Sequence, residues 1–215
     1  MVSINKIRFI GFIFLGLFLF YFSFNFFVYA DEEIDWDSIK TKGASELNNV
    51  EKDIQTNFKL AVSEANLGEI KNSYKSFDRI GDNFNQNEIN DFSNKQREEL
   101  AENDIDYEQN ILILNYIAFS QVIIEDYEEA IYYFDKILSL EPDNIWIRNY
   151  KAAGYIELEL LDKAEDYLEA TLNIKDNQFS HLLLGYIYYE RDEMFKALRK
   201  VSRARALFDL ILEMF

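Results

Sequence analysis

The sequence contains no cysteine, one proline, one histidine and seven glycines in 215 residues. Without cysteine the chain has no disulfide bonds, no thiolate nucleophile and no cysteine-bound zinc site. All-β domains with many turns need glycine or proline at most of their corners, so the scarcity of both residues argues against that class. The composition therefore favours a helical protein.

Basic residues are also few. The chain has 22 Lys and Arg against 39 Asp and Glu, which gives a formal net charge of −17. Because binding to phosphate groups requires a basic surface, we expect no nucleic acid among the partners. The sequence patterns GxSxG, HExxH and GxGxxG and the glycine-rich phosphate loop are absent, so we expect no catalysis, no cofactor and no metal site. We expect the single histidine, His181, to have a structural role. An enzyme that uses a pair of carboxylates is the alternative, and no pattern in the sequence supports it.

Residues 1–30 have the layout of a secretory signal peptide. Lys6 and Arg8 precede an apolar run over residues 9–22, and a short polar break then leads to the small residue Ala30. A basic segment, an apolar segment and a small residue in this order are typical of an export signal that is cleaved. We therefore predict cleavage after Ala30.

The alternative is that the same segment is an uncleaved membrane anchor. The run from Phe9 to Tyr29 is long enough as a helix to cross a hydrocarbon core of about 30 Å. Both interpretations place residues 31–215 outside the cytoplasmic membrane, because the basic end stays inside. We therefore expect a protein that is secreted, periplasmic or anchored facing outward, with membrane contact only through residues 1–30 if they are retained.

The segment after the signal divides into two parts. Residues 31–43 mix acidic side chains with Trp36 and have no sustained period, so we expect an acidic, solvated linker. Residues 44–105 form a predicted N-terminal helical region. Within that region the stretch 82–94 is rich in asparagine, and a weaker apolar stripe follows from Ile89 to Leu100, so we expect a loop and one short helix.

The N-terminal helical region contains a predicted helical hairpin over residues 54–82. Apolar residues recur every three or four positions from Ala44 to Ala65, and a second stripe covers Ile70–Ile80. Gly68 lies between the two stripes. This period and the intervening glycine indicate two helices joined by a turn.

Three pairs of small residues occur past residue 110. The members of a pair are twelve residues apart, and the pairs repeat after 34 and 33 residues: Ala118 and Ala130, Ala152 and Ala164, Gly185 and Ala197. Two antiparallel helices approach closely only where both present small side chains. The spacing therefore predicts three helix pairs.

The first of these units, residues 111–144, resembles a tetratricopeptide repeat. The matching positions hold large apolar, small, aromatic and closing proline residues: Leu114, Ile117, Ala118, Tyr127, Ala130, Phe134 and Pro142. Residues 145–177 and 178–210 keep most of the pattern. The resemblance implies an all-α chain in which three repeats over residues 106–215 stack as an α-solenoid of antiparallel helix pairs. The hairpin over 54–82 is a candidate for a fourth, degenerate repeat.

The resemblance also implies binding in place of catalysis. In this family the first helix of each pair lines a concave surface, and the side chains expected there are aromatic and amide: Asn115, Phe119, Trp146, Asn149, Phe179, Tyr186 and Tyr189. Such side chains suit an extended or helical peptide. The alternative for each residue is a place in the core between repeats. We therefore predict an extracytoplasmic adaptor or scaffold that holds a protein or peptide partner in its groove.

The predicted last helix, Met194 to Phe215, suggests an alternative function. It ends in the sequence ALFDLILEMF, which is apolar on nearly every side, and four of its basic residues share one face: Lys196, Arg199, Lys200 and Arg203. Copies of the chain would then assemble through this helix as a structural component of the envelope. The basic face would meet another copy or an anionic polymer, or be solvated.

Overall fold

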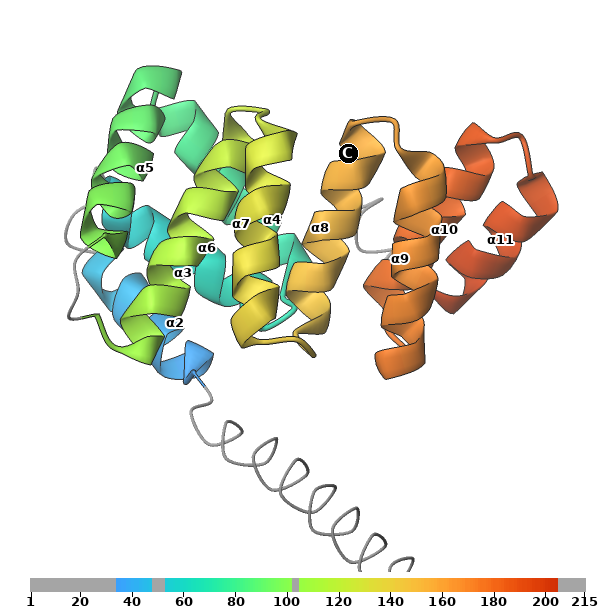
Figure 1. The fold of residues 1–215 in the computed structure, drawn as a ribbon, viewed down its shortest axis with the longest axis horizontal. Coiled ribbons are helices and arrows are strands. Elements are labelled where there is room, and N and C mark those ends of the chain that lie inside the picture. The colour runs from blue at the N-terminus through green and yellow to red at the C-terminus, as the bar shows by residue number, and fades with distance from the viewer. Residues whose placement is uncertain (1–33, 48–52, 102–104, 205–215) are drawn as a thin grey trace, which may run out of the picture. The chain divides into compact units, whose positions relative to one another are not determined.

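The computed structural model describes residues 34–47, 53–101 and 105–204. The chain divides into two units, Met1–Ile34 and Asp35–Phe215, and the ten helices of the described residues all belong to the second (Figure 1). No strand occurs in the described ranges, so the predicted all-α class is confirmed. Within these ranges no helix is both long and apolar enough for a membrane span. The predicted signal or anchor over residues 1–30 lies outside the described residues.

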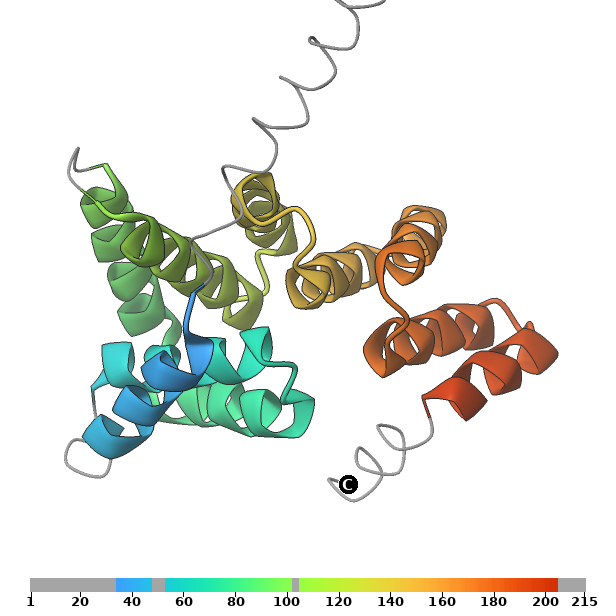
Figure 2. The same cartoon turned by 90° about the horizontal axis from the view of Figure 1, so that it is seen from below.

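Three antiparallel helix pairs follow one another in the second half of the chain. They are α6 (Tyr107–Ile123) with α7 (Tyr127–Leu140), α8 (Ile145–Glu157) with α9 (Leu161–Ile174), and α10 (Gln178–Glu190) with α11 (Met194–Arg203). Each helix packs against the next, and Figure 2 shows the six following one another in an arc. The predicted α-solenoid is confirmed. The part of the third repeat and of the predicted C-terminal helix after Ala204 lies outside the described residues.

The first pair begins four residues before the predicted repeat boundary at residue 111. Asp106 precedes α6, and its carboxylate accepts a hydrogen bond from the backbone N–H of Gln109 at 2.8 Å. A carboxylate at this position satisfies one of the free N–H groups of the first helical turn. The cap therefore extends the helix beyond the repeat pattern.

In each predicted pair of small residues, one member lies on the first helix of a helix pair and the other on the second. All six are buried: Ala118, Ala130, Ala152, Ala164, Gly185 and Ala197. At the third crossing a β-carbon on Gly185 would lie 2.7 Å from Cγ2 of Val201 in α11. A side chain at this point would therefore force the two helices apart.

The turns within the pairs share a backbone conformation that the sequence did not indicate. Glu125, Glu159 and Asp192 all have positive φ, at 66°, 58° and 58°, and Gly68 of the N-terminal hairpin has φ 74°. In all four turns the next residue donates its N–H to a carbonyl five positions back, as Asp126 does to Gln121. A non-glycine residue in this region costs roughly 1 to 2 kcal/mol. Glycine usually occupies this position, so the acidic residues found here did not indicate the turn in the sequence.

The N-terminal hairpin is confirmed as α3 (Ile54–Asn66) and α4 (Ile70–Asn83). The stripe that begins at Ala44 is shared between α3 and an earlier helix, because Asp53 starts α3 by accepting a hydrogen bond from the N–H of Thr56. The turn geometry of α3 and α4 is that of the three repeats. The interpretation of this hairpin as a degenerate repeat stays a prediction.

The predicted linker over residues 31–43 is wrong from Trp36 onward. Residues Trp36–Leu47 form α2, in which Ile39 and Gly43 are buried one turn apart. A β-carbon on Gly43 would lie 3.2 Å from the backbone nitrogen of Leu60, so α2 packs directly on α3. The sequence did not reveal this helix because two buried positions are too few to produce a visible period.

The short helix expected over Ile89–Leu100 is present but begins earlier, and the predicted loop is wrong from Gln86 onward. Helix α5 spans Gln86–Leu100 and starts with a capping box, in which Asn85 and Glu88 bind each other's backbone N–H groups. Its buried side chains include Ile89 and Phe92, which lie on one helical face. Asparagine at the cap therefore begins a helix where the composition suggested a loop.

Candidate functional site

The inner face of the first two helix pairs is covered by α3 and α4. Figure 2 shows these two helices on the inner side of the arc, and α3 packs against both α6 and α8. The Phe77 ring of α4 stacks on Phe119 of α6 with centroids 4.6 Å apart. The hydroxyls of Ser73 and Tyr150 are 3.3 Å apart, and burial raises the pKa of Tyr150 to about 12. The chain therefore fills part of its own concave surface.

The turn between α3 and α4 presses on α8. A β-carbon on Gly68 would lie 2.1 Å from Cζ2 of Trp146, which is closer than any real side chain approaches another. The positive φ of this residue also favours glycine. Gly68 therefore allows the hairpin to dock with its backbone against the Trp146 ring.

Amide side chains join the hairpin to the repeats. Asn66 donates from Nδ2 to Oδ1 of Asn115 at 2.9 Å, and Asn144 donates from Nδ2 to Oδ1 of Asn66 at 3.1 Å. Since Asn66 and Asn115 are buried, each amide satisfies a group that water cannot reach. These hydrogen bonds therefore connect the end of α3 with α6 and with Asn144, which precedes α8.

A second amide pair joins α8 to the third repeat. Asn149 donates from Nδ2 to Oδ1 of Asn177 at 3.1 Å, and Ser180 donates from Oγ to Oδ1 of Asn149 at 2.6 Å. Asn177 also caps α10 by accepting from the N–H of Ser180. These contacts fix the position of α10 relative to α8.

The predicted binding residues thus divide into two groups. Asn115, Phe119 and Asn149 are buried, so the prediction that they line an open surface is wrong. The physical reason is that α3 and α4 cover the first two, while the third bonds to the next repeat. Trp146 is half-buried beneath the Gly68 turn. Sequence reasoning missed the hairpin as the occupant, although Gly68 and Asn66 were visible signals.

The remaining predicted residues form an accessible surface on α10. Tyr186 is 48% exposed and Tyr189 is 58% exposed. Phe179 is half-buried against Tyr150, with ring centroids 5.5 Å apart. The spacing of Phe179, Tyr186 and Tyr189 puts them on one side of the helix, and we call them the α10 aromatic face. Burial, with the carboxylates of Glu190 and Glu157, raises the pKa of Tyr186.

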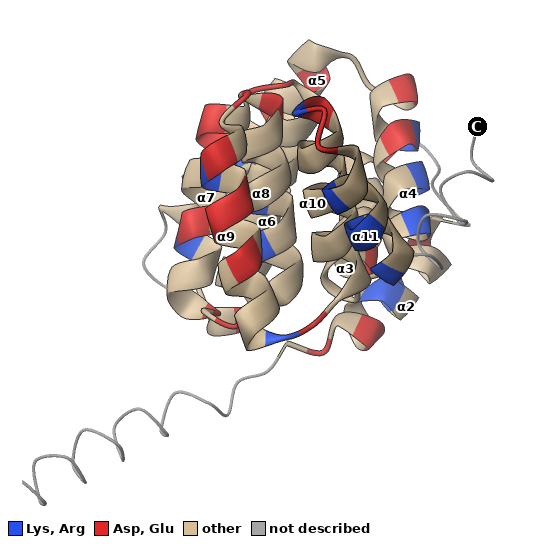
Figure 3. Ribbon diagram, turned by 90° about the vertical axis from the view of Figure 1, so that its right-hand side faces the viewer, with Lys and Arg blue, Asp and Glu red and all other residues tan. Residues whose placement is uncertain are grey.

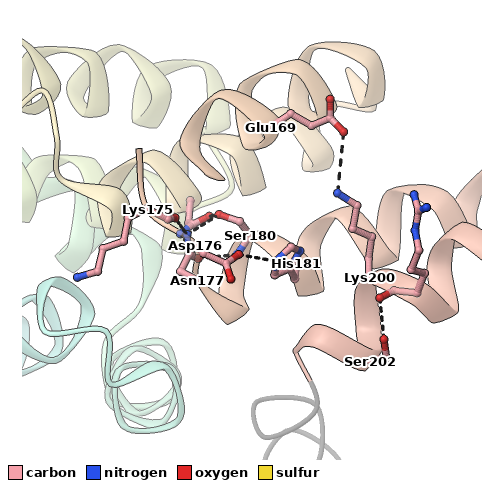
Figure 4. Close-up of polar contacts among 10 residues, drawn as sticks. Glu169, Lys175, Asp176, Asn177, Ser180, His181, Lys200 and Ser202 are labelled. Carbon is pink, nitrogen blue, oxygen red and sulfur yellow. Dashed lines mark hydrogen bonds and ion pairs between the residues drawn. The ribbon is translucent and has the colours of Figure 1, made fainter. Parts of the chain in front are cut away.

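His181 is buried in the first turn of α10. Its Nε2 lies 2.7 Å from Oδ1 of Asp176, at the junction of the α9–α10 loop and α10 (Figure 4). The adjacent Ser180 directs its hydroxyl to Asn149. The expected structural role of His181 therefore agrees with its position. No cluster of metal-binding side chains occurs in the described part of the chain.

The hairpin that covers the inner face contains a buried carboxyl group. Glu64 of α3 accepts a hydrogen bond at 2.6 Å from Oγ of Ser76, and burial raises its pKa. Nearby, Glu69 binds Nζ of Lys40 in α2 at 2.5 Å, and this hydrogen bond lowers the pKa of Glu69. Two carboxyl groups five residues apart therefore respond to burial and to an ion pair in opposite directions.

Comparison with known proteins gives a family match over part of the chain. Residues 125–191 match the family model described as tetratricopeptide repeat, from the turn between α6 and α7 to the end of α10. No curated protein matches the sequence.

Two similar solved structures are named "MamA AMB-1 C2221" and "MamA MSR-1 C2". The first is 17% identical with a TM-score of 0.45, and the match covers 72% of this chain and 99% of the other. The second is 15% identical with a TM-score of 0.48, and the match covers 82% of this chain and 98% of the other.

Substitution of Gly68 tests the docking of the hairpin. We expect Gly68→Ala to lower the free energy of unfolding by roughly 1 to 3 kcal/mol, because the methyl group is strained at positive φ and overlaps the Trp146 ring. Urea unfolding followed by circular dichroism measures the change. Gly81→Ala in α4 is the matched control, since the nearest atom to its β-carbon is 4.0 Å away. There alanine leaves the stability unchanged or increases it by up to about 1 kcal/mol. Equal stability of the Gly68 variant and the wild type would contradict this docking.

Substitution of Glu64 tests the buried carboxyl group. Because its pKa is raised in the folded chain, the protonated form favours folding, and this contribution is lost as the pH rises through the folded pKa. We expect Glu64→Gln to raise the melting temperature at about pH 7 and to have no effect at about pH 4.

Glu69→Gln is the control with the opposite sign. Its pKa is lowered by Lys40, so the charged form favours folding at neutral pH and this contribution is lost as the pH falls. We expect a lower melting temperature than wild type at about pH 7 and little difference in acid. A Glu64→Gln variant that is less stable than wild type at neutral pH would show that the ionised carboxylate supports the fold.

Proposed function

Because residues 125–191 match the tetratricopeptide repeat model, we propose that the protein is a non-catalytic scaffold that binds a protein or peptide partner on the α10 aromatic face. The observation that carries this proposal is the exposure of Tyr186 and Tyr189 on the side of α10 where the earlier repeats are covered by α3 and α4. Large aromatic side chains with a polar tip bind a partner strongly for the area they bury.

The surroundings of the aromatic face indicate the chemistry of the partner. The rings of Tyr186 and Tyr189 offer apolar contact, and Glu157 and Glu190 add negative charge close to Tyr186. A lysine or arginine beside a large apolar residue would satisfy both features, since a cation binds carboxylates and aromatic faces alike. We therefore propose an extended or helical segment of a partner that carries apolar side chains and at least one basic residue.

The proposed binding surface on α10 differs from the surface expected of three open repeats. The amides at Asn115 and Asn149 bond within the chain, so they supply no hydrogen bonds to a bound peptide. Recognition on α10 would depend on ring contact and charge, with backbone hydrogen bonds as a minor contribution. The partner contact would therefore be small and centred on a few side chains.

We also propose that the scaffold acts outside the cytoplasmic membrane. The support for this location is the composition of residues 1–30, in which Lys6 and Arg8 precede the apolar run and Ala30 precedes Asp31. If the signal is cleaved after Ala30, N-terminal sequencing of the protein from its source will begin at Asp31. A first residue of Met1 would instead favour the uncleaved anchor, and recovery of the uncleaved chain in the cytoplasm would refute export.

The binding surface is tested by alanine substitution. The wild-type protein is used to capture partners from the membrane and extracytoplasmic fractions of its source, and the affinity of a purified partner is then measured by calorimetry. We expect Tyr186→Ala with Tyr189→Ala to weaken that affinity about tenfold or more, because the loss of even one aromatic anchor commonly costs about 2 kcal/mol and a tenfold change corresponds to about 1.4 kcal/mol. Tyr132→Ala is the matched control, since Tyr132 is 54% exposed on α7. Equal affinity of the double variant and the wild type would refute the proposed surface.

A further inference from the structure

The last described helix, α11, exposes a row of large apolar side chains. Phe195 is 92% exposed, Leu198 is 61% exposed and Met194 is 49% exposed. The opposite side of the helix, which includes Ala197, is buried against α10. Apolar residues at this level of exposure, grouped on one helix, are typical of a contact surface.

The same positions in the two preceding repeats bind the following helix pair. In α7, Ile131 lies against α8, where a β-carbon on Gly154 would be 3.1 Å from its Cγ1. In α9, the carboxylates of Asp162 and Glu165 bind the guanidinium group of Arg191, the residue that follows α10. Leu198 follows Glu165 by 33 residues, as Glu165 follows Ile131 by 34. The exposed row of α11 therefore corresponds to the surface on which solenoid stacking takes place.

A basic row lies beside the apolar row. Lys196 pairs with Glu193, and Lys200 lies 3.9 Å from Glu169 of α9. Arg199 and Arg203 are exposed and take part in no ion pair found among the described residues. Figure 3 shows basic residues on α11 and many acidic residues on α7 and α9. In a chain of net charge −17, α11 thus presents an unusual positive surface.

The outer side of α9 has the complementary character. Asp166 and Glu169 are exposed on it, one turn apart, and Ala170 and Ile174 are exposed next to them. Asp162 lies on the same side and is bound by Arg191. α9 therefore has an acidic row beside an apolar row, as α11 has a basic row beside an apolar row.

We propose that α11 is a docking surface for a second copy of this chain, and that it binds the acidic outer side of α9 in that copy. Arg199 and Arg203 would face Asp166 and Glu169, while Phe195 and Leu198 would cover Ala170 and Ile174. The two surfaces are different, so the contact is head-to-tail and each copy keeps one surface free. Association then continues beyond a dimer unless the copies close into a ring. This assembly is independent of partner binding on α10.

Complementary charge reversal tests the proposal. The first variant is Arg199→Glu with Arg203→Glu, and the second is Asp166→Arg with Glu169→Arg. Sedimentation velocity at increasing protein concentration measures the mass of the chain from Asp35 onward, which forms a unit of its own. We expect the mass of the wild type to increase with concentration. Each variant alone is expected to associate at least about tenfold more weakly than the wild type. An equal mixture of the two variants is expected to associate again, because each then meets a surface of opposite charge.

Two controls keep the test specific. Asp91→Arg with Glu98→Arg reverses two exposed charges on α5, and we expect this variant to associate like the wild type. Circular dichroism and melting temperature, unchanged in all variants, establish that folding is intact. A higher salt concentration should weaken association, since exposed charges are screened.

Several results would overturn the proposal. One is a wild type that remains monomeric at every concentration, which would mean that another partner or residues 205–215 of the same chain occupy α11. Another is association of the Arg199→Glu, Arg203→Glu variant equal to that of the wild type, which would indicate contact between two α11 helices. A mixture of the two variants that stays monomeric would also refute the pairing of α11 with α9.

Discussion

The close approach of paired helices at small side chains is the contact on which the rest of the structure depends. Ala118 and Ala130, Ala152 and Ala164, and Gly185 and Ala197 are all buried, and at Gly185 no room is left for a side chain beside Val201 of α11. This contact sets the distance and crossing of each pair, and through them it decides which residues of the first helix face inward. The aromatic and amide residues of α6, α8 and α10 are placed by these crossings.

The hairpin of α3 and α4 occupies the inner surface of the first two repeats. An open array of three repeats would present Asn115, Phe119 and Trp146 to a ligand, whereas here these residues hold a segment of the same chain. The contacts resemble those of a bound helical peptide, with stacked rings, amide hydrogen bonds and a closely fitting turn. The surface left for other molecules is displaced to α10 and α11. That surface consists of exposed aromatic, apolar and charged side chains.

Much of the fold could be predicted from the sequence, because the small pairs repeat at a constant interval and large apolar residues accompany each pair. The site was less accessible to prediction. Periodicity identifies the face on which Asn115 and Phe119 lie, but it does not reveal whether that face meets solvent or another helix. The starts of α2 and α5 are each marked by one capping residue, Asp35 and Asn85. The acidic and asparagine-rich composition around these residues suggested a linker and a loop instead. Tyr186 and Tyr189 are about half exposed, since the hairpin covers α6 and α8, and their role in binding stays a prediction.

The bonds of Asn66 also bear on how the chain reaches its native state. Most repeat arrays have contacts only between neighbouring units, so that folding can start anywhere and spread. Here Asn66 bonds to residues 49 and 78 positions away, and Ser73 lies beside a tyrosine 77 positions away. Contacts of such sequence separation require large loops to close first, which slows folding and makes separate units unfold together. We therefore expect the hairpin and the first two repeats to unfold together, and to fold more slowly than an array in which only neighbouring units touch.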